Sequence, residues 1–428
     1  MLRCFSVENF LCFGPPVTLD LRPAVDSAQP TPAEPPRIVL ISGPAAAGKS
    51  ALLRALGLLR NLTLAGPRAP LAAPPHRFRA PGPTRLAIEV QIEAAIWEYE
   101  LALTPQQIVH ESLRVRPAAM AAMSGMPGTD AAPEWRLLFT RRPGDPGRPP
   151  SVEPGELPAA DANRLRLLSQ STRAEQPLLN EGLRRGQPLF VPLGRWLRDH
   201  LQLLLPEAKF VGLAARAARD PALLAFLTDY LSVADLGIAG LSVQHEPVPA
   251  GYFQNQEELD EVTAELTRFA DSFAETPEGE LIAQPTVHGS VDIERVRLAQ
   301  TVAGPDGQRA ELAIDELPST ARRLLHLSPL FYGEGDEGPP PPCAWIDDLG
   351  GGLGEGLVSA LLARFALDAD LRPGRQIIGL VQDTPAGAGD SGLGRRLLAR
   401  LKAQAPQVGA QLWALGRTSA GSQLTVVI

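Results

Sequence analysis

The segment GPAAAGKS, from Gly43 to Ser50, has the spacing G-x-x-x-x-G-K-[ST] of a loop that binds the phosphates of a nucleotide. Its lysine is unusual in this chain, because Lys49 is one of only three lysines among the 40 lysine and arginine residues. A compact ammonium on a flexible stem fits inside a wrapped loop, where the wider planar guanidinium does not. The lysine therefore indicates selection for phosphate binding, and a chance match is the alternative.

Each residue type in this segment has a part in that chemistry. Gly43 and Gly48 allow the tight turn that points backbone N–H groups at phosphate oxygens, and a helix that starts here adds its dipole. Lys49 is expected to bridge the β- and γ-phosphates, and Ser50 to give its hydroxyl to Mg²⁺. We therefore predict ATP and Mg²⁺ as the cofactors of a loop made of Gly43, Pro44, Ala45, Ala46, Ala47, Gly48, Lys49 and Ser50.

Two aspartates follow a second apolar segment and complete the predicted site. The segment CAWIDD ends in Asp347 and Asp348, directly before a glycine-rich turn. A P-loop ATPase needs a carboxylate at the end of a neighbouring buried strand, where it holds Mg²⁺ through water. Asp347 is predicted to take this metal role and Asp348 to polarise the attacking water. The alternative is a surface pair that caps the following helix.

The elements that position these residues alternate as in an α/β protein. Residues 37–42 form a continuous apolar run, which is typical of a strand buried on both faces, and an amphipathic helix is predicted over 49–62. Apolar residues at every second position, 86, 88, 90 and 92, indicate an antiparallel sheet with one face exposed to solvent. Further strands are predicted at 3–10, 17–21, 96–103, 107–115, 135–140, 238–247, 293–300, 310–314, 344–346, 376–381, 411–415 and 423–427. Helical segments are predicted at 160–235, 254–275, 320–327, 355–369 and 393–405.

This order of elements predicts three parts of the chain. Residues 1–158 form an N-terminal lobe with the phosphate loop, 159–290 a largely helical insertion, and 291–428 a C-terminal lobe in which βα alternation resumes. The proline run at 333–343 is expected to be a surface loop before a buried strand. We expect a mixed or parallel central sheet together with an antiparallel N-terminal sheet.

Composition excludes several classes of protein. The net charge of −8 argues against attraction of the whole surface to nucleic acid, and arginine clusters at 141–148, 182–186 and 392–402 are more typical of solvated faces. We expect no membrane span, because no run of 18 apolar residues occurs, and no signal peptide. Cys4, Cys12 and Cys343 are too few for a disulfide framework or a zinc site, which fits a reducing cytoplasm.

Beyond these motifs, several segments make the chain resemble a known family. It looks like the ABC-type P-loop ATPase heads of SMC-like proteins, in particular the compact prokaryotic group described as AAA family ATPase or ATP-binding protein. The resemblance is specific at the phosphate loop (Walker A) and moderate in segments 2–21, 96–115, 232–243, 315–332 and 409–428. It implies an ABC-type two-lobe architecture in which Asp347 is the Walker B aspartate.

Departures from the family pattern affect its hydrolytic residues. Ser319 stands in the signature position and keeps a hydroxyl, but the family's signature glycine is missing. The family's catalytic glutamate corresponds to Asp348, which is one methylene, about 1.5 Å, shorter. The switch histidine corresponds to Gln382, which can hydrogen-bond a phosphate oxygen but cannot carry a proton. The histidine of the turn after Walker B corresponds to Gly354.

The resemblance therefore implies an ATPase whose nucleotide-binding residues are preserved, while its hydrolytic residues depart from the family pattern. We expect a slow or partner-activated ATP hydrolase that works as a nucleotide-dependent switch, with Asp348, Gln382 and Ser319 as its catalytic residues. Ser319 of a second copy would close the site, so a homodimer on ATP is expected. The alternative is a non-hydrolysing regulator or scaffold that binds ATP.

The family also implies partners for such a head. Its members often act with a separately encoded effector protein, commonly in prokaryotic defence. The insertion is too short for a long coiled-coil arm. Nucleic acid is not indicated by the net charge, although contact with DNA through Arg184, Arg185, Arg195 and Arg198 is left open.

Overall fold

The structure is a computed structural model of the 428-residue chain. It describes all residues except 24–33, 68–70, 72, 79–81, 118–133, 145–149, 207–211, 233–237, 250, 268–271, 286–290, 304–307, 331, 333–342, 372–373, 384–391, 406–408, 419–420 and 428. Several sheets and helices make the chain a mixed α/β protein, as predicted. No helix of the described residues is long and apolar enough to cross a membrane.

The chain divides into two compact units. Unit 1 comprises Met1–Pro206, Pro339–Gly350 and Val358–Ile428, and unit 2 comprises Glu207–Gly338 and Gly351–Leu357. The predicted boundaries at residues 158 and 290 do not coincide with these breaks, and the three-part division stays a prediction.

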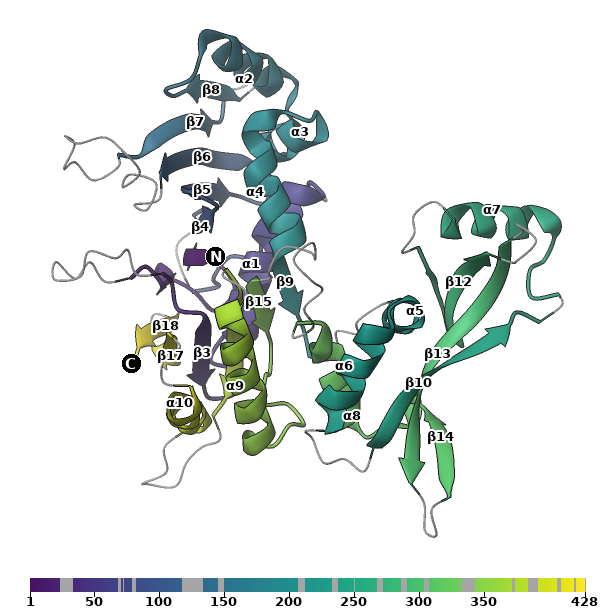
Figure 1. Cartoon of the computed structure of the whole chain (residues 1–428). Coiled ribbons are helices and arrows are strands. Elements are labelled where there is room, and N and C mark those ends of the chain that lie inside the picture. The colour runs from purple at the N-terminus through teal and green to yellow at the C-terminus, as the bar shows by residue number, and fades with distance from the viewer. Residues whose placement is uncertain are drawn as a thin grey trace, which may run out of the picture. The chain divides into compact units, whose positions relative to one another are not determined.

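An antiparallel sheet forms one part of unit 1. Its described strands follow the order β2-β1-β4-β5-β6-β7-β8 (Figure 1). These are β1 (Leu2–Glu8), β2 (Val17–Asp20), β4 (Thr84–Ile92), β5 (Ala95–Leu103), β6 (Ile108–Pro117), β7 (Arg136–Arg142) and β8 (Ser151–Pro154). Leu86, Ile88 and Val90 alternate along β4 and are buried, which gives the sheet the single core face that the sequence pattern predicts.

A second sheet of unit 1 is mostly parallel and contains the predicted loop. Its order in the described chain is β18-β17-β3-β16-β15-β9, and only the pair β17–β18 is antiparallel. Its strands are β3 (Ile38–Gly43), β9 (Leu201–Leu204), β15 (Cys343–Ile346), β16 (Gln376–Gln382), β17 (Ala410–Thr418) and β18 (Gly421–Val426). All six residues of β3 are buried, as its continuous apolar run predicts.

Helices cover these sheets in unit 1. They are α1 (Lys49–Leu64), α2 (Ala159–Ser171), α3 (Leu178–Arg184), α4 (Val191–Arg195), α9 (Glu355–Leu371, whose first turn belongs to unit 2) and α10 (Leu393–Gln404). Helix α1 contacts β1, β3 and β4, so its leucine stripe joins the core of both sheets. On the parallel sheet, α10 contacts β3, β16 and β17.

One buried side chain joins the two sheets of unit 1. Gln376, at the start of β16, has no exposed surface. Its Oε1 accepts a hydrogen bond from the Leu2 N–H at 2.9 Å, and its Nε2 donates to the carbonyls of Leu2 at 3.1 Å and Pro36 at 3.0 Å. Because this amide is bonded to both sheets, it fixes β1 against the strands that carry the loop.

A buried carboxylate ties the antiparallel sheet to the helical segment that follows it. Glu111 of β6 is fully buried and accepts hydrogen bonds from the Leu178 N–H at 2.7 Å and the Leu179 N–H at 3.0 Å. The Tyr99 hydroxyl donates to it at 3.0 Å, and Arg141 pairs with it at 3.3 Å. Arg141 also donates to the carbonyls of residues 173 and 176, so the charge pair holds the segment between α2 and α3 against the sheet.

Unit 2 is built on a second antiparallel sheet. Its described strands are β10 (Ile238–Pro247), β11 (Ala274–Thr276), β12 (Gly279–Pro285), β13 (Val291–Ala303) and β14 (Arg309–Ala313), and its helices are α5 (Leu213–Arg219), α6 (Pro221–Ser232), α7 (Gln256–Leu266) and α8 (Ser319–Leu327). The sheet order is β10-β13-β12-β11, with β14 also paired to β13. Short helical turns elsewhere in the chain are Pro188–Phe190, Trp196–His200, Ile314–Glu316 and Ser328–Leu330.

Three expectations for this region differ from the structure. The helix predicted over 254–275 is α7, which ends at Leu266 before β11. The helical region 160–235 also contains β9. The strands at 293–300 and 310–314 pair antiparallel as β13 and β14, so βα alternation does not resume there. The proline-rich loop 333–342 and part of the segment 232–243 lie outside the described residues.

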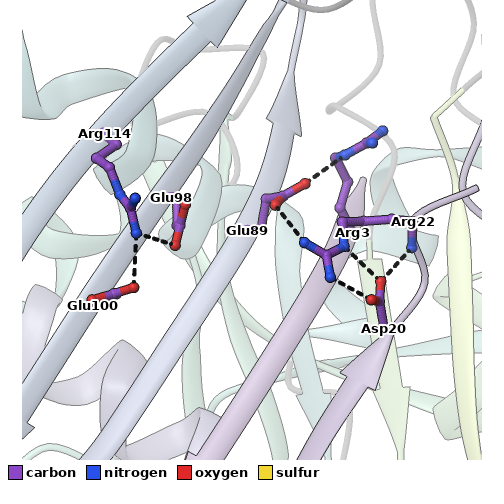
Figure 2. A network of polar contacts seen from close by, with 7 residues as sticks. All are labelled: Arg3, Asp20, Arg22, Glu89, Glu98, Glu100 and Arg114. Atoms are coloured by element: carbon purple, nitrogen blue, oxygen red, sulfur yellow. Dashed lines mark hydrogen bonds and ion pairs between the residues drawn. The ribbon is translucent and has the colours of Figure 1, made fainter. Parts of the chain in front are cut away.

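Charged residues cover the other face of the N-terminal sheet (Figure 2). Arg3 bonds Glu89 at 2.8 Å, and Arg22 lies between Asp20 and Glu89. On neighbouring strands, Arg114 contacts Glu98 at 2.8 Å and Glu100 at 3.0 Å. Partial burial raises the pKa of Glu98 to about 7, against the opposing effect of Arg114.

Removal of the Glu111 carboxylate is expected to destabilise unit 1 strongly. Glu111→Ala leaves the Arg141 guanidinium and two helix N–H groups buried without their acceptor, which should cost about 3–5 kcal/mol in the free energy of unfolding. Urea unfolding followed by circular dichroism measures this loss. Glu153→Ala, an exposed glutamate of β8, is the control and should change stability by less than about 0.5 kcal/mol. Equal effects of the two variants would contradict the role of Glu111.

Glu98 should make stability fall as pH rises. Its pKa of about 7 in the folded state lies above the usual 4.5, so the folded state binds the proton more tightly and loses stability between about pH 4.5 and 7. Glu98→Gln should therefore gain about 1 kcal/mol relative to the parent on going from pH 5 to pH 8, after allowance for solvent screening. Thermal unfolding at the two pH values tests this, with Glu153→Gln as control. A parallel shift of parent and Glu98→Gln would rule it out.

Candidate functional site

The predicted phosphate loop connects β3 to α1 in unit 1. Helix α1 begins at Lys49, and Gly48 precedes it with a φ of 109°. Ala46 also has a positive φ, of 59°. These left-handed residues turn the chain sharply between a buried strand and the N-terminus of a helix, where unpaired backbone N–H groups are available to an anion.

Both glycines of the loop are packed so tightly that a side chain has no room. A Cβ on Gly43 would lie 2.4 Å from the Leu415 carbonyl oxygen of β17. A Cβ on Gly48 would lie 2.7 Å from the Cys12 Sγ and 3.0 Å from the Ser422 Oγ. The glycines are thus required by close approach of neighbouring strands as well as by the turn.

The Lys49 ammonium lies inside the loop. Its Nζ donates hydrogen bonds to the carbonyl oxygens of Gly43 and Pro44, each at 2.8 Å, and the residue is 9% exposed. Burial lowers the pKa of Lys49, while the carboxylates of Asp383, Asp347 and Asp348 act in the opposite direction. The loop is therefore closed by a cation that faces a set of acidic residues.

The two predicted aspartates follow β15, which pairs in parallel with β16 and β9. Asp347 is 5% exposed, and its N–H donates to the Leu204 carbonyl at 2.8 Å. Its Oδ1 accepts from the Asp348 N–H at 3.0 Å. Asp348 has a φ of 49° and is half-buried. Because Asp347 is buried and α9 begins only at Glu355, the pair is not a surface cap of that helix.

The other two predicted catalytic residues lie in different units of the chain. Gln382 is the exposed last residue of β16. Ser319 is the exposed first residue of α8 in unit 2, where the neighbouring Thr320 hydroxyl donates to the Gly352 carbonyl at 2.8 Å. The helix with the predicted signature position is thereby bonded to the glycine-rich turn that follows Asp348.

A cavity of about 460 Å³ in unit 1 brings most of the predicted residues together. Within the predicted set, the residues that line it are Ala45, Ala46, Gly48, Lys49, Ser50, Asp347, Asp348 and Gln382. Pro44 contributes its carbonyl to Lys49, while Gly43 and Ala47 are buried behind the loop. Cationic, hydroxyl and carboxylate groups thus converge on one space.

Sequence reasoning missed several residues of this cavity. Leu11, Cys12 and Arg417 also line it, from the turn after β1 and from the end of β17. Asp383, which follows Gln382, donates its backbone N–H to the Gly43 carbonyl at 3.0 Å. No motif marks these positions, because strands far apart in the sequence bring them to the loop.

Mg²⁺ is compatible with this set of groups. No group of three or more His, Cys, Asp or Glu residues with a metal-binding arrangement occurs in the described part of the chain. Mg²⁺ does not need one, since it usually keeps several waters and binds one or two protein oxygens together with substrate phosphates. Ser50 and Asp347 line the same cavity and could supply those oxygens.

No protein-family model matches the chain, and no curated protein matches its sequence. Among solved structures, the chain is similar to the one described as the recombination mediator protein RecF-ATPrS in the RecFOR pathway. The two share 13% sequence identity over 100% of this chain and 98% of the other, with a TM-score of 0.32. A TM-score of this size does not establish a common fold, so the function must be inferred from the site itself.

Proposed function

We propose that the chain binds ATP with Mg²⁺ at the loop Gly43–Ser50 and hydrolyses it slowly or with the help of a partner. One observation supports this above the others: the loop lysine and serine share a single cavity with Asp347, Asp348 and Gln382. A loop after a buried parallel strand, with carboxylates at the end of a neighbouring strand, is the arrangement that phosphoryl-transfer chemistry needs. The chain would then be an ABC-type P-loop ATPase.

The residues of the loop have defined tasks in this proposal. Lys49 exchanges its bonds to the carbonyls of Gly43 and Pro44 for bonds to phosphate oxygens, and the N–H groups at the start of α1 bind the same phosphates. Ser50 and Asp347 would hold Mg²⁺, Ser50 with its hydroxyl and Asp347 with its carboxylate. When bound, Mg²⁺ neutralises phosphate charge and orients the phosphates.

The residues proposed to act on the attacking water are less well suited to their task than the residues that bind the phosphates. Asp348 accepts a hydrogen bond from the attacking water and orients it for in-line attack, and Gln382 donates to a γ-phosphate oxygen. The short Asp348 side chain limits this, since a misplacement of 1 Å can cost about a hundredfold in rate. This same feature favours a second candidate function, a regulator or scaffold that binds ATP without hydrolysing it.

The proposal extends to assembly. Two copies would close on ATP, with Ser319 of the second copy donating its hydroxyl to the γ-phosphate, so the dimer is a nucleotide-dependent switch. A separately encoded effector, a role in prokaryotic defence and a cytoplasmic location follow from the family resemblance alone. Contact with DNA through Arg184, Arg185, Arg195 and Arg198 is left open and is not part of the proposal, because the net charge of −8 does not indicate it.

Loss of the loop ammonium should weaken nucleotide binding strongly. Lys49→Ala removes the charge that balances the phosphates, and we expect affinity for ATP–Mg²⁺ to fall by about a hundredfold. Isothermal titration calorimetry measures it. Lys402→Ala removes an exposed lysine of α10 and is the matched control. ATP binding that is unchanged in Lys49→Ala would refute the proposed function.

The two aspartates should separate binding from turnover. Asp347→Ala should weaken binding that depends on Mg²⁺, whereas Asp348→Ala should spare binding and lower phosphate release by about a hundredfold. Phosphate release by the parent chain, with Lys49→Ala as the inactive reference, decides between the two functions. Tight binding without turnover supports the regulator. Hydrolysis by Asp348→Ala at the parent rate would overturn the role of Asp348.

A further inference from the structure

Backbone strain in the described chain is concentrated around the phosphate-loop cavity. Among the described residues, a positive φ, which is disfavoured for an L side chain, occurs at the non-glycine residues Asn9, Leu11, Ala46, Glu93 and Asp348. Three of these residues, Leu11, Ala46 and Asp348, line this one cavity. Strained residues persist only where the surrounding structure holds them, and they gather at functional sites, so a role is expected for each of the three.

Leu11 is the one of these three residues that belongs to neither the loop nor the aspartate pair. It has a φ of 50° and is the first residue of a two-residue turn. The Phe10 N–H donates to the Phe13 carbonyl at 2.9 Å and the Phe13 N–H donates to the Phe10 carbonyl at 2.8 Å, which closes the turn. Such turns require a positive φ and normally carry glycine, asparagine or aspartate there. A leucine at this position is contrary to the local preference, so tertiary contacts must hold it.

Hydrogen bonds to the connection between α1 and β4 hold this turn. The Leu11 N–H donates to the Pro74 carbonyl at 2.9 Å. The buried Asn9 side chain accepts from the His76 N–H at 3.1 Å through its Oδ1, and its Nδ2 donates to the Gly82 carbonyl at 2.7 Å. The strained turn is therefore fixed to this connection at three points.

The second residue of the turn, Cys12, lies directly against the phosphate loop. A Cβ on Gly48 would lie 2.7 Å from the Cys12 Sγ, and the Cys12 carbonyl accepts from the Ser422 N–H of β18 at 3.0 Å. Gly48 has a φ of 109° and precedes α1, whose first N–H groups are proposed to bind phosphates. The position of Cys12 limits the conformations open to Gly48, and that position depends on the backbone of Leu11.

We infer that Leu11 is a positioning residue of the nucleotide site. Its left-handed backbone keeps Cys12 against Gly48 and so holds the phosphate loop in the conformation that binds phosphates. The inference rests on the proposed function, because it concerns the affinity of that loop for ATP. This affinity should depend on how readily residue 11 adopts a positive φ, since apparent affinity falls with the fraction of the protein in the competent conformation.

Two substitutions that change this preference test the inference. Leu11→Ile keeps the composition of the side chain, but a branched Cβ disfavours a positive φ, so affinity for ATP with Mg²⁺ should fall about tenfold. Leu11→Asn keeps nearly the same shape and favours a positive φ, so its affinity should stay within about twofold of the parent. Isothermal titration calorimetry on the full chain measures the affinity of each protein.

Glu93→Thr is the matched control. Glu93 is exposed between β4 and β5, has a φ of 51° and does not line the cavity. A branched Cβ strains the fold there as well, but ATP affinity should not change. Alkylation of Cys12 by iodoacetamide without nucleotide, followed by peptide mass spectrometry, is a second readout. It should be faster in Leu11→Ile than in the parent, in Leu11→Asn or in Glu93→Thr, because the turn no longer holds Cys12 against Gly48.

The outcomes separate this inference from the proposed function. Parent-like ATP affinity in Leu11→Ile, or equal losses in Leu11→Ile and Leu11→Asn, overturns the role of the Leu11 backbone and leaves ATP binding at the loop intact. An equal loss in Glu93→Thr overturns it too, since it traces the effect to general destabilisation. If Leu11→Ile does not fold, a large loss of affinity in Leu11→Asn alone contradicts the inference. A parent that binds no ATP overturns the proposed function together with the inference.

Discussion

The site depends on how closely two strands and one turn approach the phosphate loop. The Leu415 carbonyl of β17 occupies the space where a side chain of Gly43 would begin, and Cys12 of the turn after β1 and Ser422 of β18 do the same at Gly48. Such packing leaves the loop one conformation and fixes the cavity walls on both sides of it. Gln376 lies at the opposite end of β16 from the loop, where its buried amide bonds β1 and the segment before β3 and so joins the two sheets.

Much of the fold could be predicted from the sequence because its hydrophobic periods are clear. The continuous run of β3, the alternation of β4 and the leucine stripe of α1 each have one simple explanation, and the structure confirms all three. The short strand β9 has the letters LQLL inside a leucine-rich helical region, and nothing local separates it from a helix. Its strand conformation comes from parallel pairing with β15, a partner more than a hundred residues away.

Part of the candidate site could likewise be predicted from the sequence, and part could not. The loop and the aspartate pair could be found because each is contiguous in sequence and follows an apolar strand. Leu11, Cys12, Asp383 and Arg417 could not, since only the order of strands brings them to Lys49. The helix predicted over 254–275 extends too far for a related reason: its amphipathic pattern continues, but Ala274–Thr276 pairs with β12 instead.

The main segment of unit 2 is inserted between two neighbouring strands of the parallel sheet, and both connections leave unit 1 close to the candidate site. The chain leaves unit 1 after Pro206, just beyond β9, and again after Gly350, just beyond β15. Asp347 lies at the end of β15 and is hydrogen-bonded to Leu204 of β9. Both of these exits therefore lie within a few residues of Asp347 and of the Leu204 carbonyl to which its backbone N–H is bonded.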